Sequence, residues 1–72
     1  MELAERLKIS LKAARVNAEM TLDEVAKALH RGKQTIASWE NWKTEPKASD
    51  LDALCELYGV TMDDIFLPTK LT

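Results

Sequence analysis

Cysteine, glycine, proline and long apolar runs are all scarce in this chain of 72 residues. The single Cys55 cannot close an intrachain disulfide, and no Cys/His cluster surrounds it to indicate a zinc site. No apolar run approaches the roughly 20 residues that a membrane span needs, and no signal-peptide pattern opens the chain. These absences predict a soluble cytoplasmic protein without a bound metal.

The patterns that accompany enzymatic chemistry are missing as well. The sequence shows no paired carboxylates placed for acid–base work, no Ser/His/Asp set, no metal-ligand spacing and no Gly-rich phosphate loop. We therefore expect a protein that is not an enzyme and that binds no cofactor.

Helical periodicity is what the chain does contain. There are two glycines and two prolines and no β-branched alternation, so the fold is expected to be all-α. Residues 1–72 are expected to form one small domain, with a core from about residue 3 to 67 and a tail at 68–72. A domain of this size has a modest core and a stability of roughly 3–5 kcal/mol, unless a dimer adds to it.

Apolar spacing and cap residues predict five helices. They are expected at residues 2–17, 22–29, 33–40 and 48–58, followed by a short fifth helix that continues through Ile65 and Phe66. The expected buried side chains are Leu3, Leu7, Leu11, Ala14, Val25, Ala26, Leu29, Ile36, Trp39, Leu51, Leu54, Cys55 and Tyr58. Two capping boxes, Thr21 with Glu24 and Thr61 with Asp64, mark helix starts, and Gly59 suits the end of the fourth helix.

The most informative segment, residues 21–41, is predicted to be two short helices joined by a tight turn. The second of them presents Lys33, Gln34 and Ser38 on the side opposite its apolar residues. Gln34 could bond adenine N6 and N7, Lys33 could reach guanine O6 and N7, and Ser38 accepts several partners. A helix with such an edge is suited to the major groove of DNA, so these three residues are the expected base readers.

Short polar and cationic side chains flank that edge. The residues expected to contact the DNA backbone are Thr21, Arg31, Thr35, Asn41 and Lys43. Contacts with phosphates fix the register of a protein on DNA and supply salt-dependent affinity, but they carry no sequence information.

Charge is distributed unevenly, although the net charge is only −2. Residues 27–47, the positive block, hold five bases (Lys27, Arg31, Lys33, Lys43, Lys47) and two acids (Glu40, Glu45). Residues 48–67 hold five acids (Asp50, Asp52, Glu56, Asp63, Asp64) and no base. Because the positive block coincides with the two-helix segment, we expect it to face a polyanion and the acidic stretch to face away.

From about Leu11 to Phe66 the chain resembles the Cro/CI (XRE-type) helix-turn-helix family of phage and bacterial regulators. The residues that carry the resemblance are Arg15, Met20-Thr21, Val25-Ala26, Leu29, Thr35-Ile36, Trp39-Glu40-Asn41, Lys43, Pro46, Leu54, Gly59-Val60 and Asp64-Ile65-Phe66. The resemblance implies a compact five-helix, lambda-repressor-like fold, a recognition helix at 33–40, and a homodimer on a pseudo-palindromic double-stranded operator. It also implies a mostly buried ion pair between Arg15 and Glu40, whose disruption can cost about 3–5 kcal/mol.

The chain departs from the family at four positions. Leu22 stands where the family usually has a glutamine that anchors a phosphate, so that side-chain contact is absent. Glu19, His30 and Trp42 stand where the family often has glycine. A left-handed backbone is therefore expected at these three residues, at a cost of about 1–2 kcal/mol for Glu19 and Trp42.

The resulting hypothesis is a sequence-specific DNA-binding transcriptional regulator of the repressor kind. Alternatives within the DNA-binding class are the DNA-binding antitoxin of a toxin pair and the controller protein of a restriction system. An alternative of another class is a helical protein-interaction module whose acidic face binds a partner. In that case Lys33, Gln34 and Ser38 would be an ordinary solvated helix face.

Some side chains could have either a structural or a functional role. Trp42 could lie on the DNA backbone, but such a residue more often packs over its own loop. His30 is more often a turn residue than a pH sensor, and Cys55 is expected to be a buried small hydrophobe. The acidic stretch is expected to be a solvated face, and Leu67 and Leu71 could contribute to a dimer.

Overall fold

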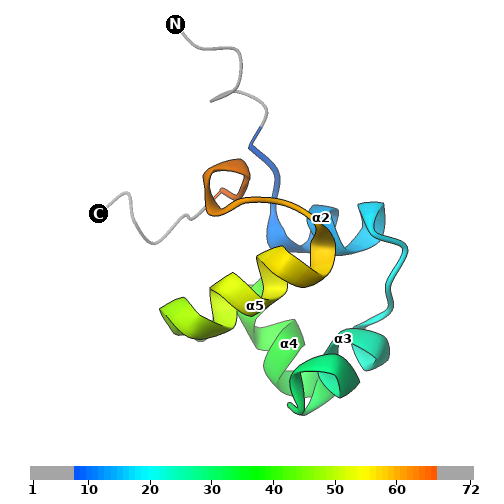
Figure 1. Ribbon diagram of the computed structural model, residues 1–72. Coiled ribbons are helices and arrows are strands. Elements are labelled where there is room, and N and C mark those ends of the chain that lie inside the picture. The colour runs from blue at the N-terminus through cyan, green and yellow to red at the C-terminus, as the bar shows by residue number, and fades with distance from the viewer. Residues whose placement is uncertain (1–7, 67–72) are drawn as a thin grey trace, which may run out of the picture.

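The computed structural model describes residues 8–66 of the chain. This part contains four α-helices and one 3₁₀ turn and has no β-strand (Figure 1). The elements are α2 (Leu11–Asn17), α3 (Leu22–Leu29), α4 (Lys33–Glu40), α5 (Ala48–Tyr58) and the turn η1 (Met62–Asp64). The predicted all-helical fold is confirmed, whereas the count of five helices is not.

The three central helices have the predicted bounds because their ends are encoded locally. The Thr21 hydroxyl accepts a hydrogen bond from the backbone N–H of Glu24 at 3.1 Å, and the Glu24 carboxylate accepts one from the N–H of Thr21 at 2.8 Å. This capping box satisfies donors that the first turn of α3 leaves unpaired. At the other end of the fold, α5 stops at Gly59, whose φ of +74° is the left-handed conformation that glycine adopts without strain.

The first helix of the described residues is shorter than predicted. A continuous helix over residues 2–17 is wrong, because α2 begins only at Leu11. The Ser10 hydroxyl accepts a hydrogen bond from the N–H of Ala13 at 3.0 Å and so caps the helix start. Ile9, just before it, is extended and forms an isolated parallel bridge with Ile65. The predicted buried residues Leu3 and Leu7 lie outside the described residues.

The expected fifth helix is also wrong in length and type. The Thr61–Asp64 capping box is present, but the turn it opens is a single 3₁₀ turn that ends before Ile65. The N–H of Ile9 donates to the Asp64 carbonyl at 2.9 Å, and the N–H of Phe66 donates to the Ile9 carbonyl at 2.8 Å. These bonds to the other end of the chain hold residues 65–66 extended, so helix cannot continue there. Leu67, Pro68 and Leu71 lie outside the described residues.

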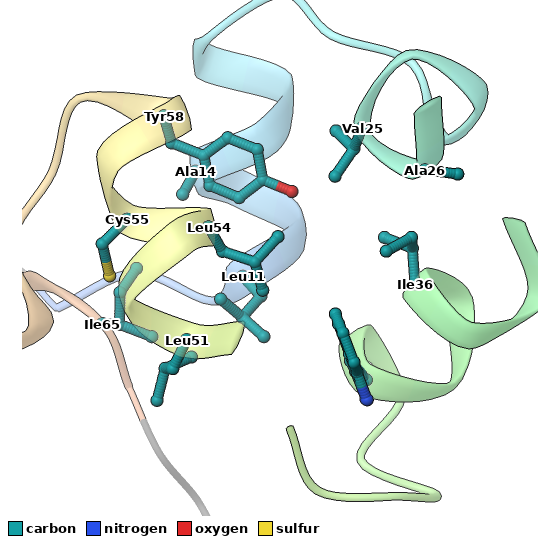
Figure 2. Close-up of a cluster of buried hydrophobic side chains, with 11 residues drawn as sticks. Leu11, Ala14, Val25, Ala26, Ile36, Leu51, Leu54, Cys55, Tyr58 and Ile65 are labelled. Atoms are coloured by element: carbon teal, nitrogen blue, oxygen red, sulfur yellow. The ribbon is translucent and has the colours of Figure 1, made fainter. Parts of the chain in front are cut away.

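The core forms where the four helices and Ile65 meet around α5 (Figure 2). Its members are Leu11, Ala14, Val25, Ala26, Ile36, Trp39, Leu51, Leu54, Cys55, Tyr58 and Ile65, all less than a tenth exposed. Each fully buried aliphatic side chain contributes about 1.5–3 kcal/mol relative to an exposed one. Leu29 was also expected in the core and is half-buried against it. Among residues 8–66, no helix is long and apolar enough to span a membrane.

Candidate nucleic-acid interface

The turn between α3 and α4 is three residues long and is held by backbone hydrogen bonds. His30 ends α3 in the left-handed conformation with φ +57°, and the N–H of Arg31 donates back to the Ala26 carbonyl at 2.9 Å. Gly32 is the N-cap of α4 and offers no side-chain cap. Helices α3 and α4 pack against each other across this turn (Figure 1). The arrangement is the predicted pair of short helices joined by a tight turn.

The two sides of α4 differ sharply in exposure. Ile36 and Trp39 point into the core and are 1% and 4% exposed. Lys33 and Gln34 are exposed, and Ser38 is half-buried. We call Lys33, Gln34 and Ser38 the reading edge. The structure brings these three residues together on one helix whose opposite side is fixed by burial.

The side chains expected to contact the DNA backbone lie at both ends of this helix pair. Asn41 and Lys43 are exposed just after α4, and Thr35 is half-buried within it. Thr21 is exposed at the start of α3, but both its hydroxyl and its N–H take part in the capping box. The remaining expected residue, Arg31, is half-exposed and has a carboxylate partner within the protein.

The carboxyl end of α4 is fixed to α2 by the ion pair that the family resemblance implies. Arg15 Nε donates to Glu40 Oε2 at 2.7 Å, and a second guanidinium nitrogen donates to Oε1 at 3.3 Å. The third nitrogen donates to the Met20 carbonyl at 2.9 Å. The side chains are 12% and 7% exposed, so this is the mostly buried bridge that was expected. Its hydrogen bonds with Glu40 raise the pKa of the Arg15 guanidinium.

The turn that precedes α4 is linked to α5 by a second ion pair, which sequence reasoning missed. An Arg31 guanidinium nitrogen donates to Asp50 Oδ1 at 2.7 Å, and the guanidinium lies 5.7 Å from the ring centre of Trp39. Asp50 was expected on a solvated acidic face, but it is only 8% exposed. A buried carboxylate needs a partner, and Arg31 supplies it. No local pattern signals this pair, because its members are 19 positions apart.

With this geometry in place, comparison with known proteins identifies the family. Residues 11–65 match the family model HTH_3, described as helix-turn-helix. The chain belongs to this helix-turn-helix family. It is a DNA-binding regulatory family of the XRE type and typically non-enzymatic, so membership indicates a DNA-binding transcriptional regulator. Neither the curated proteins nor the solved structures contain a significant match.

Three residues that replace glycines common in this helix-turn-helix family adopt the left-handed conformation. Glu19, His30 and Trp42 have φ values of +60°, +57° and +57°, as the family resemblance implies. Each ends or follows a helix at a turn. The chain therefore adopts a left-handed backbone at these turns, at a conformational cost that glycine would avoid.

The other side chains with both a structural and a functional interpretation lie partly in the core and partly on the surface. Trp42 is half-buried and packs against the core. Cys55 is buried, and burial raises the pKa of its thiol. His30 is exposed in its turn. The acidic residues Asp52, Glu56, Asp63 and Asp64 are exposed, so the solvated face predicted from the sequence lacks only Asp50. Over the described ranges, no three His, Cys, Asp or Glu side chains gather as metal ligands.

Proposed function

We propose that this helix-turn-helix protein is a sequence-specific double-stranded-DNA-binding repressor that inserts α4 into the major groove. The observation that carries the proposal is the asymmetry of α4. Its apolar side is buried in the core, while Lys33 and Gln34 stand exposed at its amino end. Base edges are read mainly from the amino-terminal part of such a helix.

Each residue of the reading edge has a distinct role in this proposal. Gln34 recognises adenine through N6 and N7, and Lys33 recognises guanine through O6 and N7. Ser38, half-buried one turn later, makes a shorter contact with a neighbouring base or sugar. The neighbouring Ala37 is small and lets the helix backbone approach the groove floor.

Phosphate contacts are proposed for Asn41 and Lys43 beyond the end of α4, and for Thr35 and Thr21 within the helix pair. Asn41 and Lys43 are exposed on the same segment that follows the reading edge. The amide N–H of Thr21 is taken by Glu24, so a contact from Thr21 must use its hydroxyl. These contacts set the register and provide the salt-dependent part of the affinity.

We further propose that the repressor acts in the cytoplasm as a homodimer on a pseudo-palindromic operator. A single chain with a net charge of −2 has little long-range attraction for DNA. Two copies related by a two-fold axis would place their α4 helices about 34 Å apart, one turn of the duplex, and so bind with both reading edges at once.

Selection of binding sites from random duplex DNA tests the function. The proposal predicts enrichment of two related half-sites about one helical turn apart, and filter binding that weakens steeply between a low and a higher salt concentration. A chain that enriches no sequence and binds no duplex at either salt concentration is not a DNA reader. That outcome would favour the protein-interaction module.

Substitution of Lys43 by alanine tests the proposed backbone contact. Loss of one phosphate contact should weaken binding to every duplex alike and lower the salt slope by about one. The control is Lys12→Ala, which removes an exposed lysine from α2, outside the positive block. An unchanged slope for Lys43→Ala would place this side chain away from the DNA backbone.

A further inference from the structure

Arg31 joins three helices from the turn that precedes the reading edge. Its backbone N–H donates to the Ala26 carbonyl of α3 at 2.9 Å. Its guanidinium lies 5.7 Å from the ring centre of Trp39 in α4 and donates to Asp50 of α5 at 2.7 Å. One residue therefore ties both helices of the helix-turn-helix to the helix behind them.

Asp50 is the fixed side of this contact. It lies in the first turn of α5, where a carboxylate is favoured by the positive end of the helix. Its side chain is 12% exposed, whereas that of Arg31 is 44% exposed. The arginine end is open to water, which weakens the attraction between the two charges, while the buried Asp50 still depends on Arg31 as its partner. The geometry of the pair still restricts where the turn can lie.

The first turn of α4 is held in the core by Ile36 but has no side-chain cap. Its N-cap is Gly32, which has no side chain to bond the first turn. The other end of α4 is fixed to α2 through Glu40 and Arg15. The Arg31–Asp50 pair is the corresponding attachment at the amino end, next to Lys33 and Gln34. A shift of this end would move the reading edge relative to the segment that carries Asn41 and Lys43.

We propose that Arg31 and Asp50 are positioning residues for DNA binding, which set the direction in which the amino end of α4 leaves the turn. This inference rests on the proposed function. It assigns Arg31 to Asp50 and Trp39 instead of to a phosphate. It also gives Asp50 a role in DNA binding. A carboxylate is repelled by the phosphates, so this role does not involve contact with DNA.

The sign of one substitution separates positioning from phosphate contact. Asp50→Asn removes a negative charge, which by itself favours DNA binding. If Asp50 positions the reading edge, the same change should weaken binding to the selected duplex by roughly 3- to 30-fold, with an unchanged salt slope. The matched control is Asp52→Asn, an equal change of charge at an exposed site on α5, which should lose no affinity.

A neutral double variant keeps the test valid if a single change unfolds the protein. Arg31→Gln combined with Asp50→Asn leaves no charge unpaired, and circular dichroism verifies that it is folded. Positioning predicts that this double variant binds the selected duplex roughly 3- to 30-fold more weakly than the unsubstituted protein, again with an unchanged salt slope. A phosphate contact from Arg31 predicts a slope lower by about one.

The orientation of α4 is measured independently of DNA. Residual dipolar couplings of the α4 amides, compared with those of α5, should change in Asp50→Asn and stay constant in Asp52→Asn. Unchanged couplings, or an Asp50→Asn variant that binds the selected duplex as tightly as the unsubstituted protein, would overturn the positioning role. Failure of the unsubstituted protein to bind any duplex would instead overturn the proposed function.

Discussion

Two ion pairs of equal length but different surroundings hold the carboxyl end of α4 and the turn that precedes its amino end. Both the Arg15–Glu40 and the Arg31–Asp50 pair have a nitrogen–oxygen distance of 2.7 Å. The side chains of Arg15 and Glu40 are 12% and 7% exposed. Those of Arg31 and Asp50 are 44% and 12% exposed. Distance alone therefore says little about what an ion pair does. Burial indicates that breaking the first pair is costly to the fold, whereas the second pair is the one proposed to fix the direction of α4.

The hydrogen-bond networks of the two pairs differ in the same way. Arg15 uses all three nitrogens, two for Glu40 and one for the Met20 carbonyl, so it also holds the loop between α2 and α3. Arg31 makes one hydrogen bond with Asp50.

Substitution of Glu40 by glutamine should be the most damaging change. It leaves the mostly buried Arg15 without a counter-charge and is expected to lower the free energy of unfolding by about 3 kcal/mol. A domain with a total stability of roughly 3–5 kcal/mol would then be close to unfolded. Urea denaturation followed by circular dichroism measures this. The control Glu56→Gln alters an exposed carboxylate of α5 and should change stability by less than about 0.5 kcal/mol. A similarly small loss for Glu40→Gln would contradict the importance of burial.

Tyr58 provides a spectroscopic reporter near the buried Arg15–Glu40 pair. Burial, followed by the nearby Glu40 carboxylate, raises its pKa from 10 to about 12. The protonated phenol is thus favoured in the native state. The contribution of Tyr58 to stability is therefore fully present below pH 10 and is lost as the pH rises toward 12. Tyr58 is the only tyrosine, and the ultraviolet absorbance of tyrosinate therefore follows this residue alone. A native titration midpoint near 10 would show that the phenol is solvated.

Gln34→Ala tests the reading edge itself. Loss of a bidentate contact with adenine should remove about 1–3 kcal/mol of discrimination at one base pair of the selected site. Binding to unrelated duplexes should stay the same, because phosphate contacts are untouched. Competition among single-base-pair variants of the site measures both quantities. Equal weakening on every sequence would reject base reading by Gln34.

Glu19→Gly should stabilise the protein slightly on the α2 side. A left-handed φ of +60° costs an L residue about 1–2 kcal/mol, and glycine removes this cost. Glycine also raises the conformational entropy of the unfolded chain, which offsets part of the stabilisation. A net increase of about 0.5–1 kcal/mol in unfolding free energy is expected. Lys27→Gly in α3 is the opposite control and should cost about 1 kcal/mol. Loss of stability in both variants would mean that Glu19 makes a contact worth more than its strain.

Features encoded by neighbouring residues were predictable from the sequence. The Thr21–Glu24 capping box, Gly59 at the end of α5 and the burial of Ile36 and Trp39 depend on residues within one or two helical turns. The left-handed conformation of three residues and the Arg15–Glu40 pair were predicted from the resemblance to the family. No pattern in a single sequence shows that two residues 25 positions apart meet.

Features created by distant contacts were not predictable. The segment around Ile9 has the apolar spacing of a helix, but the N–H and carbonyl of Ile9 pair with Asp64 and Phe66 near the other end of the chain. The same pairing stops η1 before Ile65. Asp50 looked like one more surface acid, because its neighbours in sequence give no hint of Arg31. An apolar stripe predicts which side of a helix is buried, but it does not specify which residues pack against that side.

The claim that the reading edge meets DNA is tested most directly by nuclear magnetic resonance of the labelled protein during addition of duplex DNA at low salt. The proposed function predicts that amide shifts change most at Lys33, Gln34 and Ser38, with smaller changes at Asn41 and Lys43. The acidic residues Asp52, Glu56, Asp63 and Asp64 should remain unaffected. Shift changes confined to that acidic face, or none at all, would contradict the account.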